Sequence, residues 1–209
     1  MLTKEQLNIL SSFKEDVFCS LTFKQIKERS RQRSNNLVQI ALDTFQRSNL
    51  IRSKKIGNVF TYKLNLDNNL TLAYLNLINQ LFLEKSKLPH DILAKIQGKV
   101  QKKTEFFILL IFGSYAKKKA TRQSDLDIAI ITDTDKKELV PSLESIRRRE
   151  LLNIDSHIFT RKDFLQMLEQ EMENVGKQIY KNSIPYYGYI EYVQMIKNER
   201  QIKIIPSKG

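Results

Sequence analysis

A continuous apolar run that ends abruptly in Gly-Ser restricts the fold of this chain more than any other feature of its sequence. Residues 106–112 read Phe-Phe-Ile-Leu-Leu-Ile-Phe, which is typical of a short strand buried on both faces. Gly113 and Ser114 follow, and residues 115–120 are good helix formers. A strand, a tight turn and a helix N-terminus leave backbone N–H groups free to hold phosphate oxygens. Gly113 allows a close backbone approach, and Ser114 adds a hydroxyl.

A pair of carboxylates begins the next strand. Ten residues separate Ser114 from Asp125, and residues 125–131 read Asp-Leu-Asp-Ile-Ala-Ile-Ile. Residues two apart on a strand face the same side, so the side chains of Asp125 and Asp127 project together. Two adjacent carboxylates repel each other unless a divalent cation lies between them. Oxygen ligands of this kind favour Mg²⁺, with Mn²⁺ as the alternative, over zinc.

A third acid lies on a later strand-like stretch, residues 151–159. If that stretch pairs beside the Asp125 strand, Asp155 completes a triad of carboxylates. His157 falls on the same strand face as Asp155, where it can approach a metal or nucleotide or serve as a hydrogen-bonded neighbour. Three acids, two metal ions and a phosphate-holding turn suit a two-metal phosphoryl transfer.

These residues resemble the motif of the DNA polymerase β-type nucleotidyltransferase superfamily, which is a hydrophobic residue, Gly-Ser, a spacer and Asp-hydrophobic-Asp-hydrophobic, with a third Asp later. The resemblance covers about residues 105–189 and includes the Gly-Ser-x-Ala…Ser-Asp-x-Asp form of its minimal and antibiotic-type members, with Ala116 and Ser124 in place. Many minimal members continue with Arg-Gly, where this chain has Lys117 and Lys118. This departure leaves a basic partner at Lys117 and removes the glycine.

The resemblance implies an α/β domain with a mixed sheet flanked by helices, and a transferase that moves an NMP, expected to be AMP from ATP, to a hydroxyl. It implies two Mg²⁺ ions and an acceptor that is a protein such as a toxin, a small molecule, or a nucleic acid end. The implied catalytic and metal-binding residues are Asp125, Asp127 and Asp155, and the implied nucleotide-binding residues are Gly113, Ser114, Lys117 and Ser124.

The first third of the chain has a different organisation. We expect a helix from Thr3 to about Ser20, a second one capped by Thr22 and Gln25, and a third over residues 35–47, before any strand. The third helix is expected to bury Leu37, Ile40, Ala41, Leu42 and Phe45. Gly57 and Asn58 then mark the tight turn of a hairpin over residues 49–64.

This order resembles the winged helix-turn-helix of transcriptional regulators over about the first 66 residues. In that family the third helix enters the major groove and the wing touches the backbone. Winged helices also serve as protein-docking or dimerisation modules, so both roles stay open. If the segment reads DNA, the residues that would face it are Arg31, Arg33, Asn35, Asn36, Gln39, Arg52, Lys54 and Lys55.

The remaining segments complete a three-part organisation: residues 1–66 as the winged helix, 67–104 as a helical connector broken at Pro89, and 105–209 as the transferase domain with C-terminal helices. The first helical piece of the connector is apolar almost all round, which implies burial between domains or in a homodimer. Three consecutive cations at residues 147–149 are expected to end a helix as a solvated cluster, or to receive a nucleic acid or acidic partner.

Charge agrees with this division. The chain holds 35 Lys and Arg against 23 Asp and Glu, a formal +12, and residues 1–66 hold 12 against 5, a net +7. The single cysteine, Cys19, excludes an internal disulfide, and no apolar run is long enough for a membrane span, so we expect a cytoplasmic protein. The competing hypothesis is a DNA-binding regulator whose transferase domain only senses nucleotide or is inactive.

Overall fold

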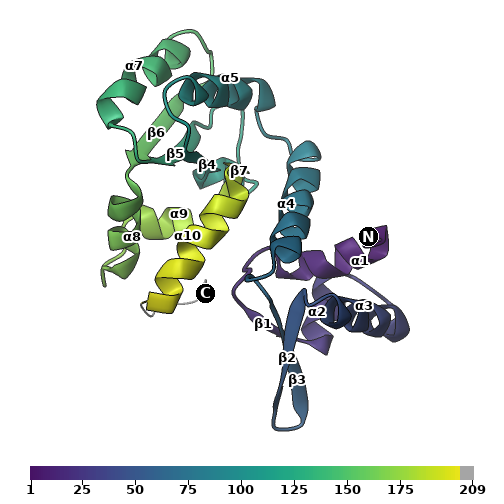
Figure 1. The fold of residues 1–209 in the computed structure, drawn as a ribbon. Coiled ribbons are helices and arrows are strands. Elements are labelled where there is room, and N and C mark those ends of the chain that lie inside the picture. Colours follow the sequence, from purple (N-terminus) through teal and green to yellow (C-terminus); the bar gives the residue numbers. More distant parts are fainter. Residues whose placement is uncertain (203–209) are drawn as a thin grey trace. The chain divides into compact units, whose positions relative to one another are not determined.

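The computed structural model describes residues 1–202, and the chain divides into two compact units, Met1–Glu84 and Lys85–Gly209 (Figure 1). The helical segment 67–104 is divided between them at this boundary. None of the described helices is both long enough and apolar enough to cross a membrane.

The first unit combines helices with a three-stranded antiparallel sheet in the order β1-β3-β2. Thr3 and Thr22 both form capping boxes, with Gln6 and Gln25 respectively, as the sequence predicts for the second of them. The core holds fully buried Phe13 and Phe45. The elements are α1 (Lys4–Leu10), a 3-10 helix (Ser11–Phe13), β1 (Ser20–Thr22), α2 (Phe23–Arg29), α3 (Asn35–Arg47), β2 (Ile51–Ile56), β3 (Val59–Leu64) and α4 (Asn69–Glu84).

Two sequence expectations for the start of this unit are wrong. The first helix ends at Leu10 rather than near Ser20. A 3-10 helix follows it, and beyond that the Asp16 carboxylate accepts from the Phe18 backbone N–H at 2.9 Å in a non-helical turn. A strand, β1, precedes α2; it has only three residues, too few for a periodic pattern, and is formed by its pairing with β3. The winged helix assignment stays a prediction.

The buried face of α3 is also different from the expected one. Val38, Ala41, Leu42 and Phe45 are buried at helical spacing, whereas Leu37 and Ile40 are 44% and 47% exposed. Each of these two residues lies one position, or about 100° of helix rotation, before a buried residue. Both are apolar and are therefore expected in the core, but they lie at the edge of the buried face of α3 and are exposed to solvent.

The second unit is built on a four-stranded mixed sheet in the order β6-β5-β4-β7. β5 and β6 are parallel, and the other two pairs are antiparallel, so the mixed sheet is confirmed. Helices α5 and α7 lie on one side of the sheet, and α8 and α10 lie on the other (Figure 1). The elements are α5 (His90–Gln101), β4 (Phe107–Ile111), α6 (Gly113–Ala116), β5 (Leu126–Thr132), α7 (Lys136–Arg147), β6 (Ile154–Phe159), α8 (Arg161–Glu169), α9 (Val175–Lys181), β7 (Ile184–Tyr187) and α10 (Tyr189–Ile202).

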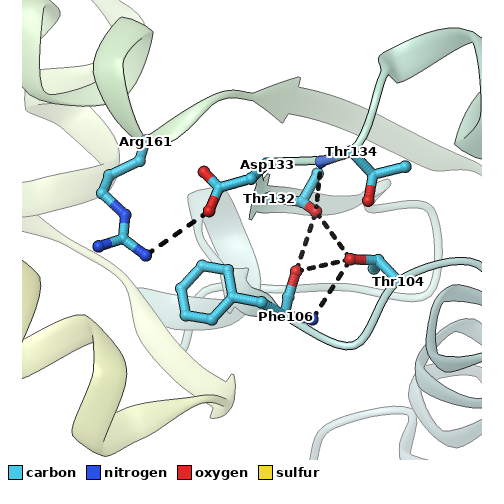
Figure 2. A network of polar contacts seen from close by, with 6 residues as sticks. All are labelled: Thr104, Phe106, Thr132, Asp133, Thr134 and Arg161. Atoms are coloured by element: carbon cyan, nitrogen blue, oxygen red, sulfur yellow. Dashed lines mark hydrogen bonds and ion pairs between the residues drawn. The ribbon is translucent and has the colours of Figure 1, made fainter.

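A polar network closes one end of the sheet, where β4 begins and β5 ends (Figure 2). The Thr132 hydroxyl donates to the Phe106 carbonyl at 2.9 Å and accepts from the Thr134 backbone N–H at 3.2 Å. The guanidinium of Arg161 lies 4.7 Å from the Phe106 ring centre and 3.7 Å from an Asp133 carboxylate oxygen. Because β4 and β5 are antiparallel, the predicted site residues gather at the opposite end.

Candidate active site

The backbone turn after β4 brings Gly113 against the side chain of Asp127. The Phe112 backbone N–H donates to the Asp127 carbonyl at 3.0 Å, which extends the β4–β5 ladder to the turn itself. Gly113 has a φ of +64°, and a β-carbon added there would lie 1.8 Å from Asp127 Oδ2. A side chain at position 113 would displace the Asp127 carboxylate, so glycine is the residue that allows this approach.

The helix that follows is shorter than expected. α6 has only four residues and ends at Ala116, not at Ala120, because Lys118 adopts a φ of +56° that breaks the helix. The N–H groups of this single turn lie at the start of the helix, but one turn supplies little of the dipole that a long helix would add. Lys117 is exposed, and the Ser124 hydroxyl accepts from the Thr121 backbone N–H at 2.8 Å.

Asp127 and Asp155 stand opposite each other on neighbouring strands. The parallel register pairs them directly, and residues paired in this way point to the same face of the sheet. Asp125 precedes β5 and is exposed, and its Oδ1 accepts from Asn153 Nδ2 at 3.0 Å. Sequence reasoning missed Asn153, although its place two residues before Asp155, on the same side of the strand, could have suggested it.

Electrostatics link the three acids. Partial burial raises the pKa of the Asp127 carboxyl, and the negative charges of Asp155 and Asp125 raise it further, while a hydrogen bond from the Ser114 backbone N–H lowers it. A carboxylate with this many negative neighbours is a good ligand for a divalent cation, which removes the repulsion. The donor set, all oxygen, fits a hard ion such as Mg²⁺.

The acids do not form a closed ligand cluster. Within residues 1–202, no group of three or more His, Cys, Asp or Glu side chains is arranged to hold a metal ion. Asp127 and Asp155 share a face of the sheet, and Asp125 lies just before β5. The fit to Mg²⁺ therefore rests on the oxygen ligands of the carboxylates and on their mutual repulsion.

His157 contacts one of the three acids, Asp155. Its Nε2 lies 3.3 Å from Asp155 Oδ2. The imidazole lies parallel to the Phe159 ring, with centroids 6.0 Å apart, and 5.6 Å from the Phe112 ring. This packing fixes the ring against the same face of the sheet, so His157 is a hydrogen-bonded neighbour of Asp155, as one of its two sequence interpretations expects.

Comparison with known proteins bears on this second unit. Residues 94–187 match the family model described as polymerase beta, nucleotidyltransferase. The match runs from within α5 to the end of β7 and includes the turn at Gly113 and all three acids, so it supports a polymerase β-like nucleotidyltransferase domain. No curated protein and no solved structure shows a significant match to the chain.

The residues predicted to face DNA lie in the first unit, and all of them are exposed. They group around the start of α3 and along β2. Some already have protein partners: Gln39 donates to Asp43 at 2.9 Å, and Arg52 pairs with Asp67 at 3.1 Å. The exposed set is Arg31, Arg33, Asn35, Asn36, Gln39, Arg52, Lys54 and Lys55.

Proposed function

We propose that the second unit is a metal-dependent nucleotidyltransferase that moves an NMP, AMP from ATP in the expected case, to a hydroxyl acceptor and releases pyrophosphate. One observation carries the proposal: the Gly113 turn touches the Asp127 carboxylate, and Asp155 lies beside Asp127 in register. A phosphate-holding turn and two carboxylates therefore meet at one end of one sheet. The family match over the same residues supports the reaction class.

Each residue has a role that follows from its position. Gly113 and Ser114 would hold the triphosphate oxygens through the Gly113 backbone N–H and the Ser114 hydroxyl, since the Ser114 N–H already bonds to Asp127. Exposed Lys117 would add a cation at the same turn. Asp125, Asp127 and Asp155 would hold Mg²⁺, which when bound supplies charge neutralisation for the acids and the triphosphate. Ser124 would act indirectly, because its hydroxyl closes the loop through Thr121.

The position of Asp155 also indicates where the acceptor enters. The turn that would hold the nucleotide lies at the β4 side of Asp127, and Asp155 lies on the β6 side. The acceptor hydroxyl would therefore approach from β6, next to Asp155. A protein hydroxyl, a small molecule or a nucleic acid end can each satisfy this requirement.

The test is transfer of label from α-³²P ATP with Mg²⁺ to an acceptor in a cell lysate, with pyrophosphate release measured in parallel. Asp125→Asn combined with Asp127→Asn should abolish both signals. Asp133→Asn is the matched control, because this acid lies at the other end of β5 and pairs with Arg161. A wild-type protein that labels nothing and releases no pyrophosphate, with any of the four NTPs, would refute the proposal.

We propose DNA binding as the function of the first unit, and in a regulator without transferase activity it would be the main function. The supporting observation is the exposed hairpin β2–β3, where Lys54 and Lys55 have side chains in solvent and carry part of the net +7 of residues 1–66. Retention of duplex DNA should weaken steeply with salt and with Lys54→Glu plus Lys55→Glu. Absence of any retention at low salt removes this function.

A further inference from the structure

Strand β6 leaves one edge of the sheet open. It is the last strand in the order β6-β5-β4-β7, and it pairs only with β5. The Asn153 carbonyl accepts from the Leu126 backbone N–H at 2.8 Å, so by the two-residue period of a strand the backbone groups of Ile154, Ser156 and Ile158 point away from β5. In the part of the chain that the structure describes, no other segment bonds to them.

Apart from the charge of Asp155, the edge lacks the features that normally protect an exposed strand. β6 contains no Lys, no Pro and no irregularity in its pairing with β5, and it is six residues long. Natural proteins usually block an edge of this kind with such residues or with a bulge. β6 therefore has the features of a strand that pairs with another chain.

A groove runs beside this open edge. A cavity of about 280 Å³ lies between α7 and β6, and the side chains of Ile154, Ser156 and Ile158 form its β6 wall. Val140 and Leu143 of α7 form part of the facing wall. The residues that offer outward backbone groups are thus the same ones whose side chains line an apolar groove, which is the arrangement needed to bind alternate side chains of an added strand.

The rim of the groove is basic. Arg147 lines the groove and forms no ion pair among the described residues. Lys136 also lines the groove, and its Nζ lies 3.7 Å from Asp163 Oδ2. The one acid of the lining, Glu144, is already paired with Arg148 at 3.6 Å. A segment that enters this groove therefore gains from carrying an acidic residue next to Arg147, which is the member of the 147–149 cluster that lines the groove.

The same edge adjoins the candidate active site. Side chains alternate along β6, so Asp155 projects to the face opposite the groove, where Asp127 also lies. A strand added to β6 would lie about 4.8 Å further along the row that begins with Asp127 and Asp155. Its residue opposite Asp155 would project beside the acids, while the residues on either side of it would project into the groove.

We infer that β6 and its groove bind an extended, acidic segment of a protein substrate by strand addition, and that this pairing presents a Ser, Thr or Tyr hydroxyl beside Asp155. The inference rests on the proposed function and names the acceptor class. The hydroxyl oxygen forms a bond to the α-phosphorus of the NTP, and the bond from that phosphorus to the α–β bridging oxygen breaks. Pyrophosphate leaves with the electron pair, and the hydroxyl proton goes to solvent.

The probe is a set of synthetic peptides, capped at both ends, that alternate Val, Ile or Leu with Ser, Thr or Tyr and end in Asp or Glu. A second set ends in Lys. Fluorescence anisotropy should detect binding of the acidic set, and Arg147→Glu should weaken it. On binding, the backbone amides of Ile154, Ser156 and Ile158 should exchange hydrogen more slowly.

The decisive variant is Ser156→Pro, with Ser156→Ala as its matched control. The Ser156 N–H faces outward, so proline removes no bond within the sheet but blocks an added strand. We expect Ser156→Pro to weaken acidic-peptide binding at least about tenfold relative to Ser156→Ala, which keeps the outward N–H and changes only one hydroxyl of the groove wall. Equal binding by the two variants, no binding of acidic peptides, or equal binding of the Lys-ended set would overturn the inference.

Two further measurements separate this inference from the proposed function. Asp127→Asn should still bind the peptide but leave its hydroxyl unmodified by mass spectrometry. If Ser156→Pro nucleotidylates a protein acceptor as well as wild type does, the strand-addition inference is refuted and the proposed transferase function is kept. If the peptide slows amide exchange at Ile154, Ser156 and Ile158 in wild type but no acceptor is modified, the proposed transferase function is refuted. A dimer that only Ser156→Pro dissociates, seen by light scattering, would assign the edge to a second copy and overturn the inference.

Discussion

Replacing Gly113 with alanine should separate the chemistry of the site from the stability of the fold. The new β-carbon would lie 1.8 Å from Asp127 Oδ2 and 2.6 Å from its Cγ, at a residue with a φ of +64°. The clash is with the end of a side chain, so the carboxylate can rotate away at little cost in stability. The left-handed backbone conformation costs an alanine about 1–2 kcal/mol.

These two effects predict different magnitudes in two assays. For a unit the size of residues 85–209, an unfolding entropy of about 2.1 cal/mol/K per residue converts the backbone cost into a fall in Tm of about 4–8 °C. Activity should fall much further, by about a hundredfold or more, because the Asp127 carboxylate is displaced by more than an ångström. Calorimetry and pyrophosphate release measure the two quantities.

The chain offers a matched control in Gly57→Ala. Gly57 has a φ of +58°, and a β-carbon added there meets nothing within 4 Å. This variant should lose a similar amount of free energy of unfolding, in the first unit, and keep full transferase activity. Wild-type activity in Gly113→Ala, or equal loss of activity in the two variants, would refute the assignment of Gly113 and Asp127 to one site.

Three other predictions concern stability. The pKa of Asp127 is raised in the fold, so the folded state disfavours its charged form, and stability is lost as pH rises through that raised pKa. Asp127→Asn should therefore raise Tm at neutral pH and make no difference below about pH 3, where the wild-type carboxyl is protonated. Thermal melts across pH test this. Thr132→Val should lower the free energy of unfolding by about 1–3 kcal/mol, measured with denaturant, because it removes the hydroxyl at the centre of the network in Figure 2. Activity should be unchanged, and a loss of activity would contradict the assignment of the active site to the opposite end of the sheet. Gly98→Ala, in α5 with open space around the new methyl, should stabilise the second unit by up to about 1 kcal/mol, and a lower Tm would contradict this.

Sequence patterns predicted the long elements well and the short or edge elements poorly. The apolar run of β4, the capping box of α2 and the 13 residues of α3 follow from local rules, and the structure confirms each of them. β1 exists only because β3 lies beside it, and the end of α6 depends on the backbone of one lysine, Lys118. The face that α3 buries could not be fixed from periodicity, since Leu37 and Val38 fit neighbouring faces equally well.

For the site, the sequence by itself determined two local features. A buried strand ends at Gly113, and the pair Asp125 and Asp127 begins the next strand. Both follow from residue chemistry and from periods of a few residues. Only the tertiary structure decided that Asp155 lies opposite Asp127, that Asn153 bonds to Asp125, and that β6 keeps an open edge over a basic groove. Strand order and register depend on packing between segments far apart in the chain, which no local pattern encodes.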